Sequence, residues 1–281
     1  MMKTILVPTD FSPTSKNAAA YAIQIAKAWN FEKIVLYNAY QAPVISEPTM
    51  PTVQVMDFDA LRDISSAGLQ QFKSSILHLV DNNVEIETVS EFGVLDSGIT
   101  EICEKTGAEI IVMGISGGNN FEELLIGSTA TSVASHTQIP VIIVPPAAVY
   151  SRVEKVILAC NFKKVAETTP VMEIKKLLNV TKAKLFLVYV NEHKKTQDND
   201  FAVQKQKLDD LLGEYNPEYH ILESDDYVKA INEFAVTNTA DLIITIPQKH
   251  GFFNNLFKRS HTKHLAFHTN IPLMCIHGQS K

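Results

Sequence analysis

A glycine-rich segment at residues 113–129 has the residue types and the spacing of a phosphate-binding loop. Its pattern is Gly-x2-Gly-x9-Gly-Ser, formed by Gly114, Gly117, Gly127 and Ser128. Glycine lets the backbone approach a bulky anion, and free N–H groups at the start of a helix point toward negative charge. An apolar run precedes the segment, and Ser128 and Thr129 add hydroxyl groups where a helix should begin. We predict a phosphate cradle; the alternative is a plain glycine turn followed by a serine cap.

Together with this pattern, an acidic residue after the first strand gives the chain a resemblance to a known family. Asp10 follows an apolar run, and the glycine pattern follows what should be the fourth strand. In these features the chain resembles the universal stress proteins, whose first and last strands are also matched by Ile5–Ser12 and Ile139–Val144. The resemblance covers roughly the first half of the chain. It implies a nucleotide-binding member that holds ATP.

The resemblance also implies roles for individual residues. The Asp10 carboxylate would accept hydrogen bonds from ribose hydroxyls or the adenine amine; the alternative is an N-cap, although Ser12 already supplies one. Ala39 would meet the adenine through its backbone, while Met113 either packs on the base or simply ends a buried strand. Ser116 and Gly118 are secondary candidates. The residues predicted to bind the nucleotide are Pro8, Thr9, Asp10, Ala39, Met113, Gly114, Gly117, Gly127, Ser128 and Thr129.

One departure from many nucleotide-binding relatives concerns charge. The loop at residues 118–126 contains Glu122 and Glu123 but no Lys or Arg. Neutralisation of a triphosphate would therefore rest on the helix end and on a bound Mg²⁺. We expect ATP, with Mg²⁺, at modest affinity.

The second half of the sequence repeats the first. Val156–Phe162 echoes Ile5–Phe11 at an offset of 151, and Thr269–Ile276 echoes Thr137–Val144 at an offset of 132. The difference of 19 residues (151 − 132) places an insertion in the first copy, for which Gln41–Ala60 is the candidate, as a long loop after the second strand. We predict two domains, a first copy at residues 1–146 and a second copy at 151–278, joined by a short linker at 145–148.

Short apolar runs alternate with amphipathic stretches in each copy, which is typical of βαβ units and a parallel sheet. We predict an α/β fold of two tandem, Rossmann-like domains with open parallel sheets of five strands each; the family resemblance makes them adenine nucleotide alpha hydrolase-like. In the family the last strands pair two units, so the two copies should form an intramolecular pseudo-dimer. The helix after the first strand of the second copy is expected to begin at Pro170, capped by Thr169. The predicted strands are Thr4–Pro8, Lys33–Ala39, Val84–Ser90, Glu109–Met113, Val141–Val144, Lys155–Ala159, Leu185–Val190, Tyr219–Leu222, Asp241–Ile246 and Leu273–Ile276.

The second copy lacks the nucleotide pattern. Pro247 and His250 take the places of the first two glycines, Arg259-Ser260 replaces the closing Gly-Ser, and Asn161 replaces Asp10. Because proline has no backbone N–H and arginine rarely adopts positive φ, the same cradle should not form. We predict a degenerate second site. The alternative is that Lys249, Lys258, Arg259 and His261 hold an anion through their side chains.

Two further clusters in the second copy have competing interpretations. His261, His264 and His268 share one helix face and could approach a zinc ion, but no cysteine or carboxylate completes a tetrahedral set, so an ordinary helix face is the expected reading. The aromatic segment Phe252–Phe257 would either fill the vacated pocket or form a docking surface.

Composition limits the remaining choices. A net charge of −6 argues against a nucleic-acid partner, which would need a basic face. The absence of a leader or of a long apolar run, and the presence of three scattered cysteines, predict a soluble cytoplasmic protein without membrane contact. We expect a nucleotide-responsive regulator of the stress response that pairs internally or forms a homo-oligomer. The alternatives are a slow ATPase, for which no catalytic signature is present, and a ligand-free dimerisation scaffold.

Overall fold

The structure is a computed structural model that describes residues 3–41, 57–81, 83–115, 128–191, 199–247 and 270–278. The elements of the first half are β1 (Thr4–Pro8), α1 (Pro13–Trp29), β2 (Lys33–Tyr40), α2 (Phe58–Ile76), β3 (Glu85–Phe92), α3 (Leu95–Thr106), β4 (Ala108–Gly114), α4 (Ser128–His136) and β5 (Val141–Val144). Those of the second half are β6 (Lys155–Ala159), α5 (Val165–Thr168), α6 (Val171–Thr181), β7 (Lys184–Asn191), α7 (Asn199–Leu212), β8 (Glu218–Glu223), α8 (Tyr227–Thr237), β9 (Leu242–Thr245) and β10 (Leu273–Cys275). Short 3₁₀ turns follow α2 and α7.

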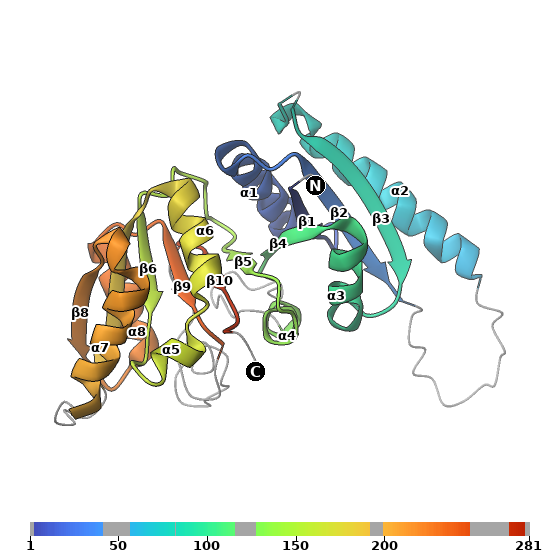
Figure 1. The fold of residues 1–281 in the computed structure, drawn as a ribbon. Coiled ribbons are helices and arrows are strands. Elements are labelled where there is room, and N and C mark those ends of the chain that lie inside the picture. The colour runs from blue at the N-terminus through green and yellow to red at the C-terminus, as the bar shows by residue number, and fades with distance from the viewer. Residues whose placement is uncertain are drawn as a thin grey trace, which may run out of the picture.

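The strands form one ten-stranded sheet in the order β3-β2-β1-β4-β5-β10-β9-β6-β7-β8. The two halves have the same internal order, because β8-β7-β6-β9-β10 corresponds strand for strand to β3-β2-β1-β4-β5. Within each half every pairing is parallel. Figure 1 shows the two halves side by side, with β5 and β10 between them. The α/β class and the predicted repeat are therefore confirmed.

The junction between the halves is antiparallel. Ile142 pairs with Met274, which is its equivalent in the repeat, and the flanking pairs are Val141 with Cys275 and Ile143 with Leu273. This register places a local pseudo-twofold axis between Ile142 and Met274. Because β5 and β10 run in opposite directions, the carboxyl ends of the two sets of strands lie at opposite edges of the sheet.

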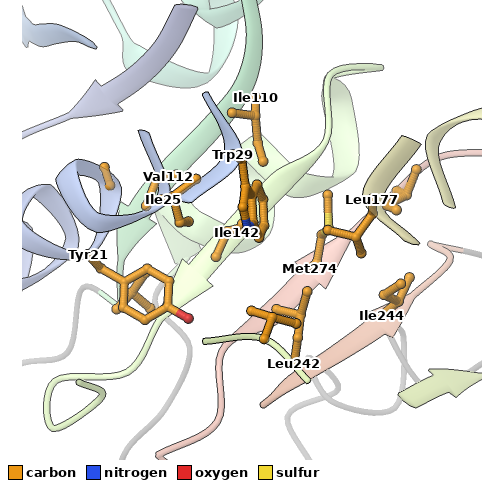
Figure 2. Close-up of a cluster of buried hydrophobic side chains, with 14 of the residues drawn as sticks. Tyr21, Ile25, Trp29, Ile110, Val112, Ile142, Leu177, Leu242, Ile244 and Met274 are labelled. Carbon is orange, nitrogen blue, oxygen red and sulfur yellow. The ribbon is translucent and has the colours of Figure 1, made fainter. Parts of the chain in front are cut away.

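Helices cover both faces of the sheet, and each hydrophobic core crosses the junction. One core packs α1, α2, α6 and α7 on one face, and the other packs α3, α4 and α8 on the opposite face. Figure 2 shows the first core at the junction, where Trp29 of α1 and Ile142 lie beside Met274 and Leu177 of α6. Burial of apolar surface from both halves in shared cores stabilises their association.

Polar contacts also join the halves. The Asn17 side-chain amide donates to the carbonyl oxygens of Pro145 and Ala148, both at 3.0 Å, and so holds the linker against α1. His277 Nε2 lies 2.6 Å from the carbonyl oxygen of Ala134 in the last turn of α4.

The strand bounds follow the sequence prediction closely. β1, β5 and β6 begin and end at the predicted residues, and the other seven differ by at most two residues at either end. The regular alternation of buried runs and amphipathic stretches explains this agreement, since buried parallel strands are marked by continuous apolar residues.

Two predictions about the connections need correction. The helix after β6 does not begin at Pro170 behind a Thr169 cap: a short helix, α5, comes first, Pro170 itself takes the N-cap position of α6, and it makes no side-chain cap. Proline prevents a continuous helix here because it has no N–H and clashes with the preceding turn. The predicted loop Gln41–Ala60 is helical from Phe58 onward; residues 42–56 lie outside the described residues.

Candidate functional site

Three of the residues predicted from the sequence, Pro8, Thr9 and Asp10, lie where the first strand, β1, ends. Pro8 is the last residue of β1 and pairs with Tyr37 of β2. The N–H of Thr9 continues this pairing, donating to the carbonyl oxygen of Tyr37 at 2.8 Å. Ligands of open parallel sheets bind at such carboxyl edges, next to the point where strand order reverses. In this half β1 lies between β2 and β4, so the reversal falls at the end of β1.

Asp10 forms a local turn and leaves the cap of α1 to Ser12. Asp10 Oδ1 accepts hydrogen bonds from the backbone N–H of Ser12 at 3.1 Å and from its hydroxyl at 2.5 Å. Ser12 Oγ in turn accepts from the N–H of Ser15 at 3.2 Å, and Pro13 occupies the first helical position. The alternative interpretation of Asp10 as the N-cap is therefore wrong, and its carboxylate is exposed at the edge of the sheet.

The electrostatic environment keeps Asp10 ionised. Partial burial opposes ionisation, but the hydrogen bonds from the Ser12 hydroxyl and backbone outweigh it and hold the pKa of Asp10 below its ordinary value. Hydrogen bonds to a carboxylate favour the charged form. At neutral pH Asp10 is thus a hydrogen-bond acceptor suited to hydroxyl or amine donors.

Phe11 adopts an uncommon backbone conformation between Asp10 and Ser12. Its φ is 65°, in the left-handed region that non-glycine residues rarely occupy. The ring contacts α2, where a Cβ added to Gly68 would lie 2.9 Å from it, and packs edge-on against Phe72 with 6.1 Å between ring centroids. Packing of the ring on α2 therefore holds the turn in a strained conformation.

Gly114 ends β4 directly beside the start of α1. A Cβ at this position would lie 2.6 Å from the carbonyl oxygen of Thr14 and 3.2 Å from the nitrogen of Ser15. Because the obstructing atoms are backbone, only glycine fits without a shift. This contact places the start of the glycine-rich segment against the turn that carries Asp10, and it gives Gly114 a structural reason that is independent of any ligand.

The other predicted residues divide into three groups. Met113 is 3% exposed and packs in the core with α3 and α4, so the structure favours its role as the end of a buried strand. Ala39 pairs with Glu91 and lies on the same face. Ser128 and Thr129 begin α4, as predicted. The residues Gly117 and Gly127, with the secondary candidates Ser116 and Gly118 and the acidic Glu122 and Glu123, lie outside the described residues.

A buried polar chain behind Asp10 was not predicted from the sequence. Asn38 Nδ2 donates to the carbonyl oxygen of Thr9 at 2.7 Å, and Asn38 Oδ1 accepts from the hydroxyl of Ser65 at 2.6 Å. The Ser90 hydroxyl donates to Ser65 Oγ at 2.6 Å. An asparagine within an otherwise apolar strand was the available signal. The partners were not foreseeable, because Ser65 and Ser90 lie on α2 and β3.

The equivalent turn of the second half repeats this geometry with different chemistry. The N–H of Lys163 donates to Asn161 Oδ1 at 3.0 Å, as that of Ser12 does to Asp10. Phe162 has a φ of 52°, and its N–H points to Cys160 Sγ at 3.4 Å, where Phe11 uses Thr9 Oγ1 at 3.0 Å. The backbone is therefore shared, whereas the carboxylate and the hydroxyl are not.

Aromatic side chains replace the buried polar chain in the second half. Tyr189 stands at the position of Asn38, and Phe162 is 5% exposed, compared with 40% for Phe11. Phe162 stacks on Phe201 with 4.6 Å between centroids and contacts Tyr189 edge-on at 5.5 Å. This edge of the second half is thus sealed by an apolar cluster, which fits the predicted loss of the site. The residues of the alternative anion site, the segment Phe252–Phe257 and His261, His264 and His268 lie outside the described residues, as do His250 and Ser260.

The other groups with catalytic potential that the structure describes are not activated. All three cysteines are free and buried, and burial raises the pKa of the Cys160 thiol to about 11. Ser132 Oγ donates to Asp96 Oδ2 at 2.6 Å. His136 Nδ1 lies 2.8 Å from the Ser132 carbonyl oxygen and 3.4 Å from Ser132 Oγ, so in the order of contacts the serine lies between the histidine and the aspartate. In a hydrolytic triad the histidine must lie between serine and aspartate, so this cluster does not activate the serine. Within the described ranges no three His, Cys, Asp or Glu residues gather as a metal site.

Comparisons with known proteins agree with these observations. The model of the universal stress protein family matches residues 1–145. A universal stress protein of Methanocaldococcus jannaschii is 31% identical over 144 residues, which cover 51% of this chain and 82% of that protein. The crystal structure of a universal stress protein from Archaeoglobus fulgidus matches 99% of this chain and 97% of its own, with a TM-score of 0.71 and 19% identity, and so supports the fold of both halves.

A shorter structural neighbour, a universal stress protein solved in complex with cAMP, covers 50% of this chain and 96% of its own at 26% identity, with a TM-score of 0.37. In the part of the chain that the structure describes, no helix is both long and apolar enough to cross a membrane.

Proposed function

Because the chain belongs to the universal stress protein family, we propose that it is a regulatory protein whose first copy, residues 1–146, binds an adenine nucleotide, with ATP and Mg²⁺ as the expected ligand. We expect the second copy, residues 151–278, to bind no nucleotide. The observation that carries the proposal is the contrast between two turns of equal backbone: one presents an ionised, exposed carboxylate, and the other an amide above an aromatic cluster.

The residues of the first copy suit the parts of a nucleotide. Asp10 supplies an acceptor for ribose hydroxyls or the adenine amine, and the backbone of Ala39 lies one residue before the end of the neighbouring strand β2, where a base would lie. The start of α4 at Ser128 supplies N–H groups for phosphate oxygens. Mg²⁺ keeps most of its ligands as water and phosphate oxygen, so it requires no dedicated cluster of carboxylates.

Calorimetry with ATP and AMP in the presence of Mg²⁺ tests the proposal. The native chain should bind, and Gly117→Val should lose binding, because a branched side chain blocks the approach of the backbone to phosphate. His250→Val changes the equivalent position of the second copy and is the matched control, which should bind as the native chain does. Failure of the native chain to bind any adenine nucleotide would instead favour a scaffold that acts through its paired halves alone.

A further inference from the structure

We propose that Asn38 is a positioning residue for the nucleotide: backed by Ser65 and Ser90, its amide fixes the Thr9 carbonyl and so presents the Asp10 carboxylate to the ribose. This inference rests on the proposed function and extends it, because it assigns a task to a buried chain that makes no direct contact with the exposed edge.

The hydrogen bonds of Asn38 leave it one orientation. Asn38 as a whole is 9% exposed, and a buried amide must find partners at both its oxygen and its nitrogen. The carbonyl oxygen of Thr9 can only accept, so the NH₂ group of Asn38 must face it, and the Ser65 hydroxyl must donate to the remaining amide oxygen. The amide cannot turn over without breaking both bonds.

The chain continues in one direction and terminates at the turn. Ser90 donates to Ser65, Ser65 to Asn38, and Asn38 to Thr9. Hydrogen bonds arranged head to tail polarise and strengthen one another. Three separate elements, β3, α2 and β2, therefore act together on one carbonyl group at the end of β1.

Thr9 is held at every polar atom, which makes it the fixed base of the turn. Its N–H donates to the carbonyl oxygen of Tyr37, its carbonyl oxygen accepts from Asn38, and its Oγ1 accepts from the N–H of Phe11 at 3.0 Å. The carbonyl group of Thr9 belongs to the peptide unit that joins Thr9 to Asp10. The N–H of Phe11 belongs to the next peptide unit, so the two bonds to Thr9 hold both peptide planes that flank Asp10 and thereby fix the direction in which its side chain leaves the backbone.

The second half serves as an internal comparison. Tyr189 stands at the position of Asn38, contacts Phe162 and has no amide group. At the position of Asp10 the second half has the uncharged Asn161. The asparagine amide that holds the turn and the carboxylate at the turn thus occur together in the first half, and both are replaced in the second.

The test measures Asp10 directly, in the full chain without ligand. Carboxyl carbon NMR follows the titration of Asp10, with Asp10→Asn to assign its signal, in the native protein, Asn38→Leu and Ser65→Ala. We expect Asn38→Leu to raise the pKa of Asp10 toward the ordinary value of about 3.9, because the carboxylate loses its alignment with Ser12. Ser65→Ala should shift it in the same direction by less.

The second readout compares ATP with 2′-deoxy-ATP. A carboxylate aimed at the ribose should give the native chain about a tenfold preference for ATP, and Asn38→Leu should reduce this preference toward one while leaving the affinity for 2′-deoxy-ATP nearly unchanged. A structural defect alone would weaken both nucleotides equally. Tyr189→Phe, at the equivalent strand position, is the control and should change neither readout.

An unchanged pKa of Asp10 together with an unchanged preference in folded Asn38→Leu would overturn the inference. Should Asn38→Leu fail to fold, the same two measurements on Ser65→Ala test the inference, because this variant removes the hydroxyl that donates to Asn38 and keeps the Asn38 amide. Should the native chain bind neither nucleotide, the proposed function fails, whereas the titration still shows whether Asn38 positions Asp10.

Discussion

The β1–α1 turn of the first half and the β6–α5 turn of the second half share a backbone and differ in chemistry. Both place a phenylalanine at positive φ, and both close with a side-chain oxygen that accepts from a backbone N–H two residues on. In the first, Thr9 and Asp10 are backed by hydroxyl and amide groups; in the second, Cys160 and Asn161 are backed by aromatic rings. The backbone of such a turn is thus a property of the fold, and its side chains decide whether it can hold a ligand.

The largest expected difference concerns the phenylalanines themselves. Phe162→Ala should destabilise the protein by about 4 kcal/mol, because it empties a buried aromatic cluster, whereas Phe11→Ala should cost about 1 kcal/mol. Alanine bears the same positive φ at either position, so the strain cancels in the comparison. Urea unfolding measures both variants, and equal losses would mean that the two turns are packed alike.

The second prediction concerns the close approach at Gly114. Gly114→Ala should cost about 2 kcal/mol or more, because the added Cβ meets the backbone of Thr14 and neither group can yield. The strand register makes Ile246 the equivalent of Gly114, one residue before the Pro247 assigned from the sequence. Ile246→Val should cost about 1 kcal/mol by ordinary loss of packing. Thermal unfolding measures the loss of stability in both variants. If Gly114→Ala left the stability unchanged, β4 and α1 could separate without cost.

A third prediction exchanges the chemistry of the two turns. Asp10→Asn gives the first turn the side chain of the second, and ATP affinity should fall about tenfold with the loss of a charged hydrogen bond. The reciprocal Asn161→Asp should create no second site, because the cluster around Phe162 remains closed. Calorimetric titration of both variants measures this, and a gain of binding by Asn161→Asp would show that a carboxylate alone is sufficient.

The smallest expected effect is the pH dependence of the stability that Ser12, the N-cap of α1, gives to the protein. Ser12→Ala should cost about 1 kcal/mol at neutral pH, since it removes the N-cap of α1. The folded pKa of Asp10 lies below its unfolded value, so the stability that Ser12 gives to ionised Asp10 is present above about pH 3.9 and is lost as the pH falls through the folded pKa. The difference in the free energy of unfolding between the native protein and Ser12→Ala should therefore become smaller at acidic pH.

Lys163→Ala is the control for this experiment, because Asn161 does not titrate. Urea unfolding between pH 7 and pH 3 should show a constant difference in the free energy of unfolding between Lys163→Ala and the native protein. A constant difference for Ser12→Ala over the same range would mean that Asp10 gains nothing from its hydrogen bonds in the folded state.

The sequence was sufficient to predict the sheet, and insufficient to predict the side-chain contacts at the carboxyl ends of its strands. Continuous apolar runs such as Val141–Val144 mark buried strands, and the internal repeat implies that the two halves share a topology. The break at Pro170 differs from the prediction, because a proline in this context is typical of a helix start and the short helix α5 before it has only weak sequence signals.

The contacts around Asp10 depend on residues far apart in the chain. Nothing in the local sequence indicates that Asn38 would reach Thr9, or that a Cβ at Gly114 would meet α1. The glycine was predicted for its freedom near phosphate, while the structure shows a packing requirement for it as well. Such pairings arise only when the elements are assembled, so the residue types were predictable and their partners were not.

Amide NMR during titration of the full chain with ATP and Mg²⁺ would show whether only the first copy binds a nucleotide. We expect chemical-shift changes at Asp10 and Phe11 that saturate at one nucleotide per chain, with the signals of Asn161 and Phe162 unchanged. Equal changes in both turns, or changes confined to the second, would contradict this expectation.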